Sequence, residues 1–265
     1  MILTDKIGWG QPLVDKSLLY LWDASEGSGS TTADRIAGVK ANLNSGVSWK
    51  TSLYGKCIYT DGSTGDVDTG VDVDFERTDP FSVSIVAKIT GDGDLVNKLG
   101  PFSNPVPPYG DYPGWVIFTQ TGQVAFFIQH KWLDGTNRIR LLTVASFANA
   151  WHTITCTYDG SSTVAGMHTY IDGVDVSRAL SGTLALSILN NNNVHMGSRT
   201  GGSSPVGEGT NYIKQVGIWN RELSLAEHQY MYRNVTIWPY LSVQEEVYRA
   251  AAATGNPWNY YAQMA

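Results

Sequence analysis

The chain has 265 residues, of which 42% are hydrophobic and 16% are charged, so it can bury a large core and lacks the charge excess of disordered proteins. Its formal net charge is -6 and it has no run of lysine or arginine, which argues against nucleic-acid and membrane partners. We find neither a signal peptide nor the roughly 20 consecutive apolar residues that a membrane span needs.

Short runs of β-branched and aromatic residues between Gly, Asn, Asp and Ser clusters predict an antiparallel all-β protein. The expected strands are 17–22, 81–89, 115–119, 123–129, 138–144, 151–158, 167–172 and 212–219. In 81–89 the odd positions are apolar, whereas Ser82, Ser84 and Lys88 share the other face, which we expect to contact water. Thr121-Gly122 and Asp172-Gly173 fit two-residue hairpin turns.

Helical signals are confined to the end of the chain. Ser224 and Glu227 have the spacing of a capping box, which predicts a helix over 224–234. A second helix is expected over 242–253, where alanines follow two early glutamates. The elements together predict two antiparallel sheets packed face to face, with a small helical addition at the C-terminal end.

Six segments, in their order and spacing, resemble a known family. They are LLYLWDASEGSGSTTADRIAGVKANL, YGKCIYTDGSTGDVDTG, WHTITCTYDG, TYIDGVDV, HMGSR and IWNRELSLAE. The pattern is similar to the laminin G-like branch of the concanavalin A-like lectin and glucanase superfamily. The resemblance implies a jelly-roll sandwich over residues 17–234, with an N-terminal arm at 1–16 and a C-terminal helical and aromatic arm at 235–265.

The sequence offers no catalytic constellation. Some relatives cleave polysaccharides with paired glutamates on one strand, but the glutamates at 26, 76, 208, 222, 227, 245 and 246 form no such pair. The histidines are scattered, and His152 is best explained as a structural residue at the start of a strand. Cys156 alternates in phase with Ile154, which indicates a buried thiol. We therefore expect no enzymatic activity and no catalytic residues.

A calcium ion is the one cofactor that the resemblance allows. Many relatives bind calcium between an Asp-containing turn, matched here by Asp34, and two acids of a late strand. Lys214 and Gln215 occupy those strand positions. We expect no metal, with the Lys214 ammonium replacing the ion and pairing with Asp34; the alternative is an exposed Lys214. A second acidic stretch is better explained by solvated carboxylates than by a metal site; it contains Asp61, Asp66, Asp68, Asp72 and Asp74.

Sugar recognition requires an aromatic platform beside polar groups, because sugars present apolar faces rimmed by hydroxyls. Two segments fit this requirement, and their candidate glycan-binding residues are Tyr109, Tyr112, Trp115, Trp132, Asp134, Asn137 and Arg138. Trp115 has a competing interpretation as a core residue, and aromatic loops also serve protein contacts.

The resemblance extends to stand-alone laminin G-like chains of tailed phages. It implies a non-enzymatic, lectin-like protein synthesised in the host cytoplasm and placed on the virion surface, as a capsid decoration protein or a fibre or adsorption subunit that binds glycans. The alternatives are a free or secreted carbohydrate-binding module and, less favoured, a polysaccharide-cleaving enzyme.

Aromatic residues also gather near both ends of the chain, and such residues are enriched at interfaces. They predict a homo-oligomer or contact with a viral shell protein, unless both arms dock on their own sandwich. The candidate contact residues are Trp9, Trp238, Trp258, Tyr260 and Tyr261.

Overall fold

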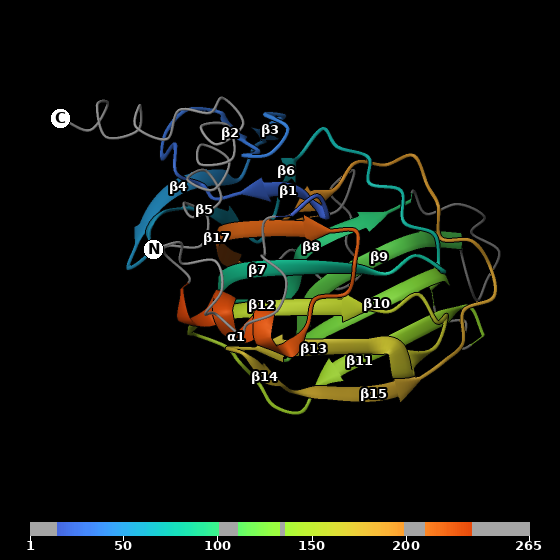
Figure 1. The fold of residues 1–265 in the computed structure, drawn as a ribbon. Coiled ribbons are helices and arrows are strands. Elements are labelled where there is room, and N and C mark those ends of the chain that lie inside the picture. Colours follow the sequence, from blue (N-terminus) through green and yellow to red (C-terminus); the bar gives the residue numbers. More distant parts are fainter. Residues whose placement is uncertain (1–14, 101–110, 133–135, 199–209, 235–265) are drawn as a thin grey trace, which may run out of the picture.

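A computed structural model describes residues 15–100, 111–132, 136–198 and 210–234. These residues form two antiparallel sheets packed face to face, as Figure 1 shows, with the first sheet (sheet A) nearer the viewer and the second (sheet B) behind it. The jelly-roll sandwich expected from the sequence is therefore confirmed. The two predicted arms and the second helix over 242–253 lie outside the described residues.

Sheet A has eight strands, in the order β14, β13, β12, β7, β17, β5 and β4, with β1 also paired to β17. Their bounds are β1 Leu18–Trp22, β4 Val47–Ser52, β5 Gly55–Asp61, β7 Phe81–Ile89, β12 Trp151–Tyr158, β13 Met167–Ile171, β14 Val174–Asp175 and β17 Thr210–Trp219. Strand β17 has two successive partners on one edge, because its first half pairs with β5 and its second half with β1.

Sheet B has nine strands, in the order β15, β11, β10, β9, β8, β16, β6, β3 and β2. Their bounds are β2 Thr31–Ala33, β3 Lys40–Leu43, β6 Val67–Asp68, β8 Gly93–Leu99, β9 Asp111–Gln120, β10 Gln123–Lys131, β11 Arg138–Thr143, β15 Ser177–Ser181 and β16 His195–Met196. A 3₁₀ turn at Val164–Gly166 precedes β13.

The main core fills the space between the two sheets. Alternate residues of each strand point into this space; in β7, Phe81, Val83 and Ile85 point inward and are fully buried. The Phe81 ring contacts Trp115 from sheet B, with 5.8 Å between ring centroids. Cys156 is buried in the same core, and burial raises the pKa of its thiol to about 12, as expected for an inert cysteine.

The expectation that the other face of β7 contacts water is wrong for its serines. Ser82 and Ser84 are buried, because β7 lies between β12 and β17 and the turn that follows β17 reaches back over it. The Ser82 hydroxyl donates to the carbonyl oxygen of Arg221 at 2.8 Å and accepts from the Leu223 amide at 2.9 Å. The Ser82 side chain therefore satisfies two backbone groups of the covering turn, whereas the Ser84 hydroxyl accepts from the Thr155 hydroxyl of β12 at 3.1 Å.

Both predicted hairpin turns are confirmed. Thr121 and Gly122 have φ of 52° and 73° between β9 and β10, and Asp172 and Gly173 have φ of 54° and 78° between β13 and β14. Positive φ at both central residues gives the turn the twist that the flanking strands require. These connections follow directly from the local sequence.

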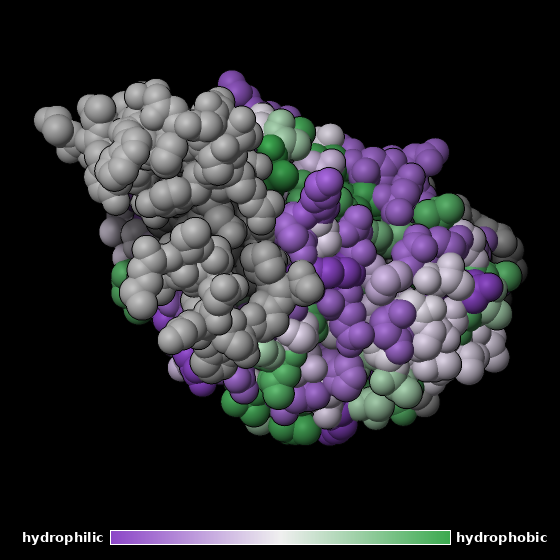
Figure 2. Space-filling view, viewed as in Figure 1, coloured by the Kyte–Doolittle hydropathy of each residue, from purple (hydrophilic) through white to green (hydrophobic). Residues whose placement is uncertain are grey.

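The predicted helix at the end of the described chain is also confirmed. Helix α1 spans Leu225–Arg233, and Ser224 and Glu227 form both bonds of the capping box. It packs against β12 and β14 on the outer face of sheet A. Within the described ranges, no helix is long and apolar enough to cross a membrane. Figure 2 shows that hydrophilic residues dominate the described surface on this side, with smaller hydrophobic patches among them.

Candidate functional site

A pocket of about 490 Å³ lies where β1 meets the segment that connects β6 to β7. Its wall combines the aromatic side chain of Tyr20, the carboxylates of Asp72, Asp74 and Asp79, and the amide of Asn220. Ligand pockets in proteins commonly measure about 300–1,000 Å³, so the pocket has room for a saccharide unit. It is the candidate functional site of the described chain.

The connecting segment places its carboxylates by alternation. Val71, Val73 and Phe75 face the core and are buried, whereas the side chains of Asp72 and Asp74 are 39% and 61% exposed. The Phe75 ring stacks on Phe81 of β7 at 4.7 Å, which fixes the end of the segment. One extended stretch thus anchors itself in the core and lines the pocket.

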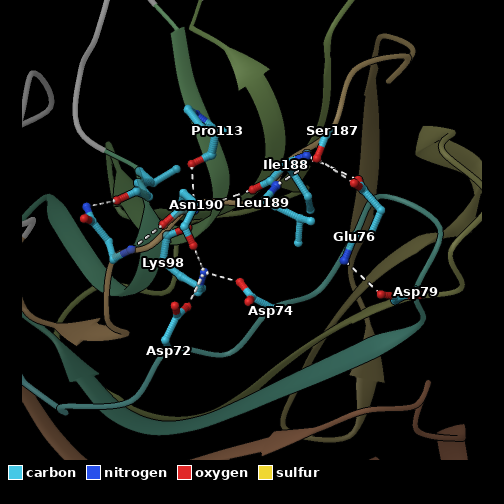
Figure 3. Close-up of polar contacts among 12 residues, drawn as sticks. Asp72, Asp74, Glu76, Asp79, Lys98, Pro113, Ser187, Ile188, Leu189 and Asn190 are labelled. Atoms are coloured by element: carbon cyan, nitrogen blue, oxygen red, sulfur yellow. Dashed lines mark hydrogen bonds and ion pairs between the residues drawn. The ribbon is translucent and has the colours of Figure 1, made fainter.

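A buried lysine stands behind the two carboxylates. The Lys98 side chain, on β8, is only 3% exposed, and its Nζ lies 2.8 Å from Asp72 Oδ1 and 3.2 Å from Asp74 Oδ1. The ammonium also donates to the carbonyl oxygen of Asn190 at 2.8 Å. Figure 3 shows Lys98 extending toward both carboxylates and Asn190 reaching the carbonyl of Pro113. A buried ammonium needs such partners, and here it holds the pocket wall in place.

Glu76 holds the segment between β6 and β7 against residues 187–188 through a second set of hydrogen bonds. Its carboxylate accepts from the Ser187 hydroxyl at 2.5 Å and from the Ile188 amide at 3.3 Å, while its own amide donates to Asp79 at 2.9 Å. Burial opposes the charged form of Glu76, but the hydrogen bond from Ser187 and those from backbone amides outweigh it and lower the pKa of the carboxyl. The acidic wall is therefore fixed before any ligand arrives.

This arrangement suits recognition of uncharged polyhydroxylated ligands. Tyr20, which stacks on Trp22 at 5.5 Å between centroids, offers an aromatic face, and the carboxylates accept hydrogen bonds from hydroxyl groups. Three carboxylates against one lysine leave the wall negative, which disfavours an anionic ligand.

The glycan residues expected from the sequence lie elsewhere, on sheet B. Trp115 is 1% exposed in the main core, so the competing core interpretation is what the structure shows. Tyr112 packs on the opposite face of the sheet with Phe127 and Trp132, and it is buried as well. Tyr109 and Asp134 lie outside the described residues.

Three of the predicted residues, Tyr112, Trp132 and Arg138, do come together on that face. The Arg138 guanidinium lies 5.4 Å from the ring centroids of both Phe127 and Trp132, but Arg138 is only 4% exposed. Asn137 accepts from the Leu186 amide at 3.2 Å through its side chain. Phe127 and Arg138 are buried in this cluster and only Trp132 is half-buried, so the pocket beside Tyr20 is the better candidate for a ligand.

The predicted pairing of Lys214 with Asp34 is wrong. The Asp34 carboxylate accepts from backbone amides of Leu21, Ile36, Ala37 and Gly38, and so organises its own turn. Lys214 instead donates to the carbonyl oxygen of Asp23. It sits at a bulge in β17, where the neighbouring strand changes from β5 to β1. Burial lowers the pKa of Lys214, although the nearby Asp23 carboxylate opposes that shift.

The carboxylates of the second acidic stretch contact both their own turns and distant segments, and two of them, Asp72 and Asp74, pair with Lys98. Asp61 accepts from the amides of its own turn, Asp66 lies 2.8 Å from His195 Nδ1, and Asp68 accepts from Gly70 and Asn193. The described part of the chain contains no group of three or more His, Cys, Asp or Glu side chains placed to hold a metal. The five candidate contact residues near the chain ends lie outside the described ranges.

Tyr20 and Lys98 were not among the site residues expected from the sequence. A usable signal was present for the carboxylates, because VDVDF at 71–75 alternates acids with core residues, whereas Lys98 lies among other polar residues in GDLVNKL. The contact between Lys98 and the acidic segment depends on the order of β6, β16 and β8 in sheet B, which the sequence does not reveal.

Comparisons with known proteins agree with this fold. A family model described as the concanavalin A-like lectin/glucanases superfamily matches residues 61–227. No curated protein matches the sequence.

Among solved structures, the binding domain of Paraclostridial Mosquitocidal Protein 1 is similar with a TM-score of 0.59 and 15% identity, over 83% of this chain and 52% of that one. Trypanosoma rangeli sialidase in complex with sialic acid is similar with a TM-score of 0.60 and 14% identity, over 86% of this chain and 35% of that one. The receptor binding domain of botulinum neurotoxin D is similar with a TM-score of 0.55 and 14% identity, over 83% of this chain and 53% of that one. The chain thus spans about half or less of the structures it matches, and at these identities the likeness shows the fold alone.

Proposed function

The chain belongs to the concanavalin A-like lectin/glucanases superfamily, and from that premise we propose that it is a non-catalytic, lectin-like protein that binds a neutral glycan in the pocket beside Tyr20. The observation that carries the proposal is the acidic wall preorganised by buried Lys98. A wall that is fixed in advance loses little conformational entropy when a sugar binds.

The absence of catalysis is part of the proposal. Glycoside cleavage by two carboxyl groups needs one that donates a proton to the leaving oxygen. Asp72 and Asp74 both accept from the Lys98 ammonium, so neither is arranged as that donor. The solved structures similar in fold include a sialidase and toxin binding domains, which leaves the site itself as the guide to activity.

Titration of the purified protein with neutral oligosaccharides tests the proposal. We expect binding by the wild type and a loss of about tenfold or more in affinity for Tyr20→Ala and for Asp72→Asn, because one removes the stacking face and the other a charged acceptor. Asp72→Asn keeps the Asp74 contact to Lys98 and should fold.

Asp92→Asn is the matched control. It removes the same charge at the other end of the sandwich, where the two Asp92 oxygens accept from the amides of Thr121 and Gly122 and asparagine keeps one of these acceptors. Equal weakening by Asp92→Asn and Asp72→Asn would contradict the pocket assignment, as would hydrolysis of the sugar by the wild-type protein.

We also propose that the protein acts on a virus particle, as a decoration protein or a fibre or adsorption subunit that self-associates. The support is its resemblance to stand-alone laminin G-like chains of tailed phages and the aromatic residues near its ends, such as Trp9 and Trp258. Mass spectrometry of density-purified particles should find hundreds of copies for a decoration protein and few for a fibre. Absence from particles would instead favour a free or secreted carbohydrate-binding module.

A further inference from the structure

A row of aromatic and basic side chains crosses the outer face of sheet A at the start of β17. The strand register places Tyr59 of β5 opposite Tyr212 of β17, Tyr212 opposite Lys88 of β7, and Lys88 opposite Trp151 of β12. Side chains directly opposite each other in a sheet project from the same face. Since Ala87 and Ile89 point into the core, this row points outward.

The rings of the row form a continuous series of contacts. Ring centroids are 4.9 Å apart for Tyr59 and Tyr212, and 6.4 Å apart for Tyr212 and Trp151. Tyr54, from the turn between β4 and β5, adds an edge contact to Trp151 at 5.5 Å. All four rings are half-buried, so each keeps accessible surface. The row is long enough to contact several sugar units of an extended chain.

Two lysines make this row positive on a protein of net negative charge. Lys50 Nζ lies 5.4 Å from the Tyr59 ring centroid and Lys88 Nζ lies 5.8 Å from that of Tyr212. Carboxylates near the row are already engaged: Asp172 accepts from His152 and from the Thr153 amide, and Asp61 accepts from its own turn. The lysines therefore remain available to an incoming anion.

A buried amide lies in the next row of the same face. Gln215 pairs with Val86, and Val86 shares its face with Lys88 two positions later. Gln215 is 2% exposed, and within the described chain neither its side-chain oxygen nor its nitrogen has a hydrogen-bond partner. An unsatisfied buried amide is costly, so this residue indicates a polar ligand group beside the rings.

From this geometry we propose that the row formed by Tyr54, Tyr59, Tyr212 and Trp151 with Lys50 and Lys88 binds an acidic polysaccharide. Sugar rings would stack on the aromatic faces, and the carboxylate or sulfate groups of the ligand would pair with the lysines. A neutral glycan would leave the lysines unused. The site is independent of the pocket beside Tyr20, which lies at the other end of β17 and has the opposite charge.

The test is calorimetric titration of the full chain at low salt with oligogalacturonate, dextran sulfate and neutral dextran. We expect both anionic polymers to bind, with affinity falling as salt is added, and neutral dextran to bind at least about tenfold more weakly. The tighter of the two anionic polymers identifies the preferred anion. The double variant Lys50→Gln/Lys88→Gln should weaken binding about fivefold or more, because each exposed ion pair contributes modestly.

Lys40→Gln is the matched control, since it removes an exposed lysine from sheet B and should leave binding unchanged. Tyr212→Leu tests whether stacking on the Tyr212 ring contributes to binding, and a thermal melt checks that each variant folds. Equal binding of neutral dextran, equal loss in Lys40→Gln, or tighter binding of a single-stranded oligonucleotide would overturn the proposal. Asp72→Asn should not affect these titrations, so failure of the pocket proposal would be seen separately.

Discussion

The two ends of β17 carry contrasting surfaces. At its end, the pocket beside Tyr20 has an acidic wall whose charge is only partly balanced from inside by Lys98, with a side chain 3% exposed. At its start, the outer row has lysines that lie against half-buried rings on the surface. The pocket depends on a buried ion pair and the row on strand register, so the two surfaces should respond differently to mutation and to salt.

Removing the partners of the buried lysine should have the largest effect on stability. In Asp72→Asn/Asp74→Asn, the buried Lys98 ammonium loses both of its negatively charged partners and keeps only neutral acceptors such as the Asn190 carbonyl. Loss of a buried charge's partners typically costs about 3–5 kcal/mol, and we expect about 3 kcal/mol because both carboxylates are partly exposed. Urea unfolding measures this loss. Adding Lys98→Met to the double variant should restore part of it, and no recovery would show that the ion pair is not the cause.

Acid should weaken the packing of α1 on sheet A. His228 is 1% exposed, its ring lies 3.9 Å from that of Tyr170, and burial lowers its pKa to about 4. A lowered histidine pKa means that its contribution to stability is complete above its usual value of 6.5 and is lost as the pH falls toward 4. The loss should approach about 3 kcal/mol by linkage.

Unfolding free energies measured from pH 7 to pH 4 check this prediction. In His228→Gln the decline over that interval should be smaller, since a glutamine does not titrate and can still donate to the carbonyl oxygen of Leu223. An identical decline in wild type and variant would assign the acid sensitivity to other groups.

Removing the surface lysines of the row should lower the free energy of unfolding much less than removing the carboxylates that pair with Lys98. Lys50→Gln and Lys88→Gln each give up one cation–π contact, worth about 0.5–1 kcal/mol at exposed sites. Urea unfolding of these lysine variants beside the Asp72/Asp74 double variant measures the difference. A loss as large as that of the Asp72/Asp74 double variant would mean that the row also contains a structural ion pair.

The smallest effect is expected from calcium. The Lys214 ammonium already bonds the Asp23 carbonyl beside the Asp34 turn, so adding calcium or a chelator should leave the melting temperature unchanged. Metal analysis after purification in calcium buffer provides the direct measurement. One tightly bound ion near Asp34, accompanied by a higher melting temperature, would contradict this expectation.

Much of the sandwich could be predicted because its signals are local. Alternating apolar residues in 81–89 define the core face of β7, and positive φ at Asp172-Gly173 requires only those two residues. The capping box of Ser224 and Glu227 lies within one helical turn. The candidate site could not be predicted in the same way, since Lys98 and Asp72 come from different parts of sheet B.

By itself, then, the sequence determined the fold class, the hairpins and the helix cap, because each depends on side chains a few positions apart. Only the tertiary structure decided which polar residues are buried and which charges meet. Ser82 lies under a turn 139 residues away, and Lys214 reaches a carbonyl 191 residues away. Such partners are set by strand order and by the bulge in β17, which place distant segments side by side.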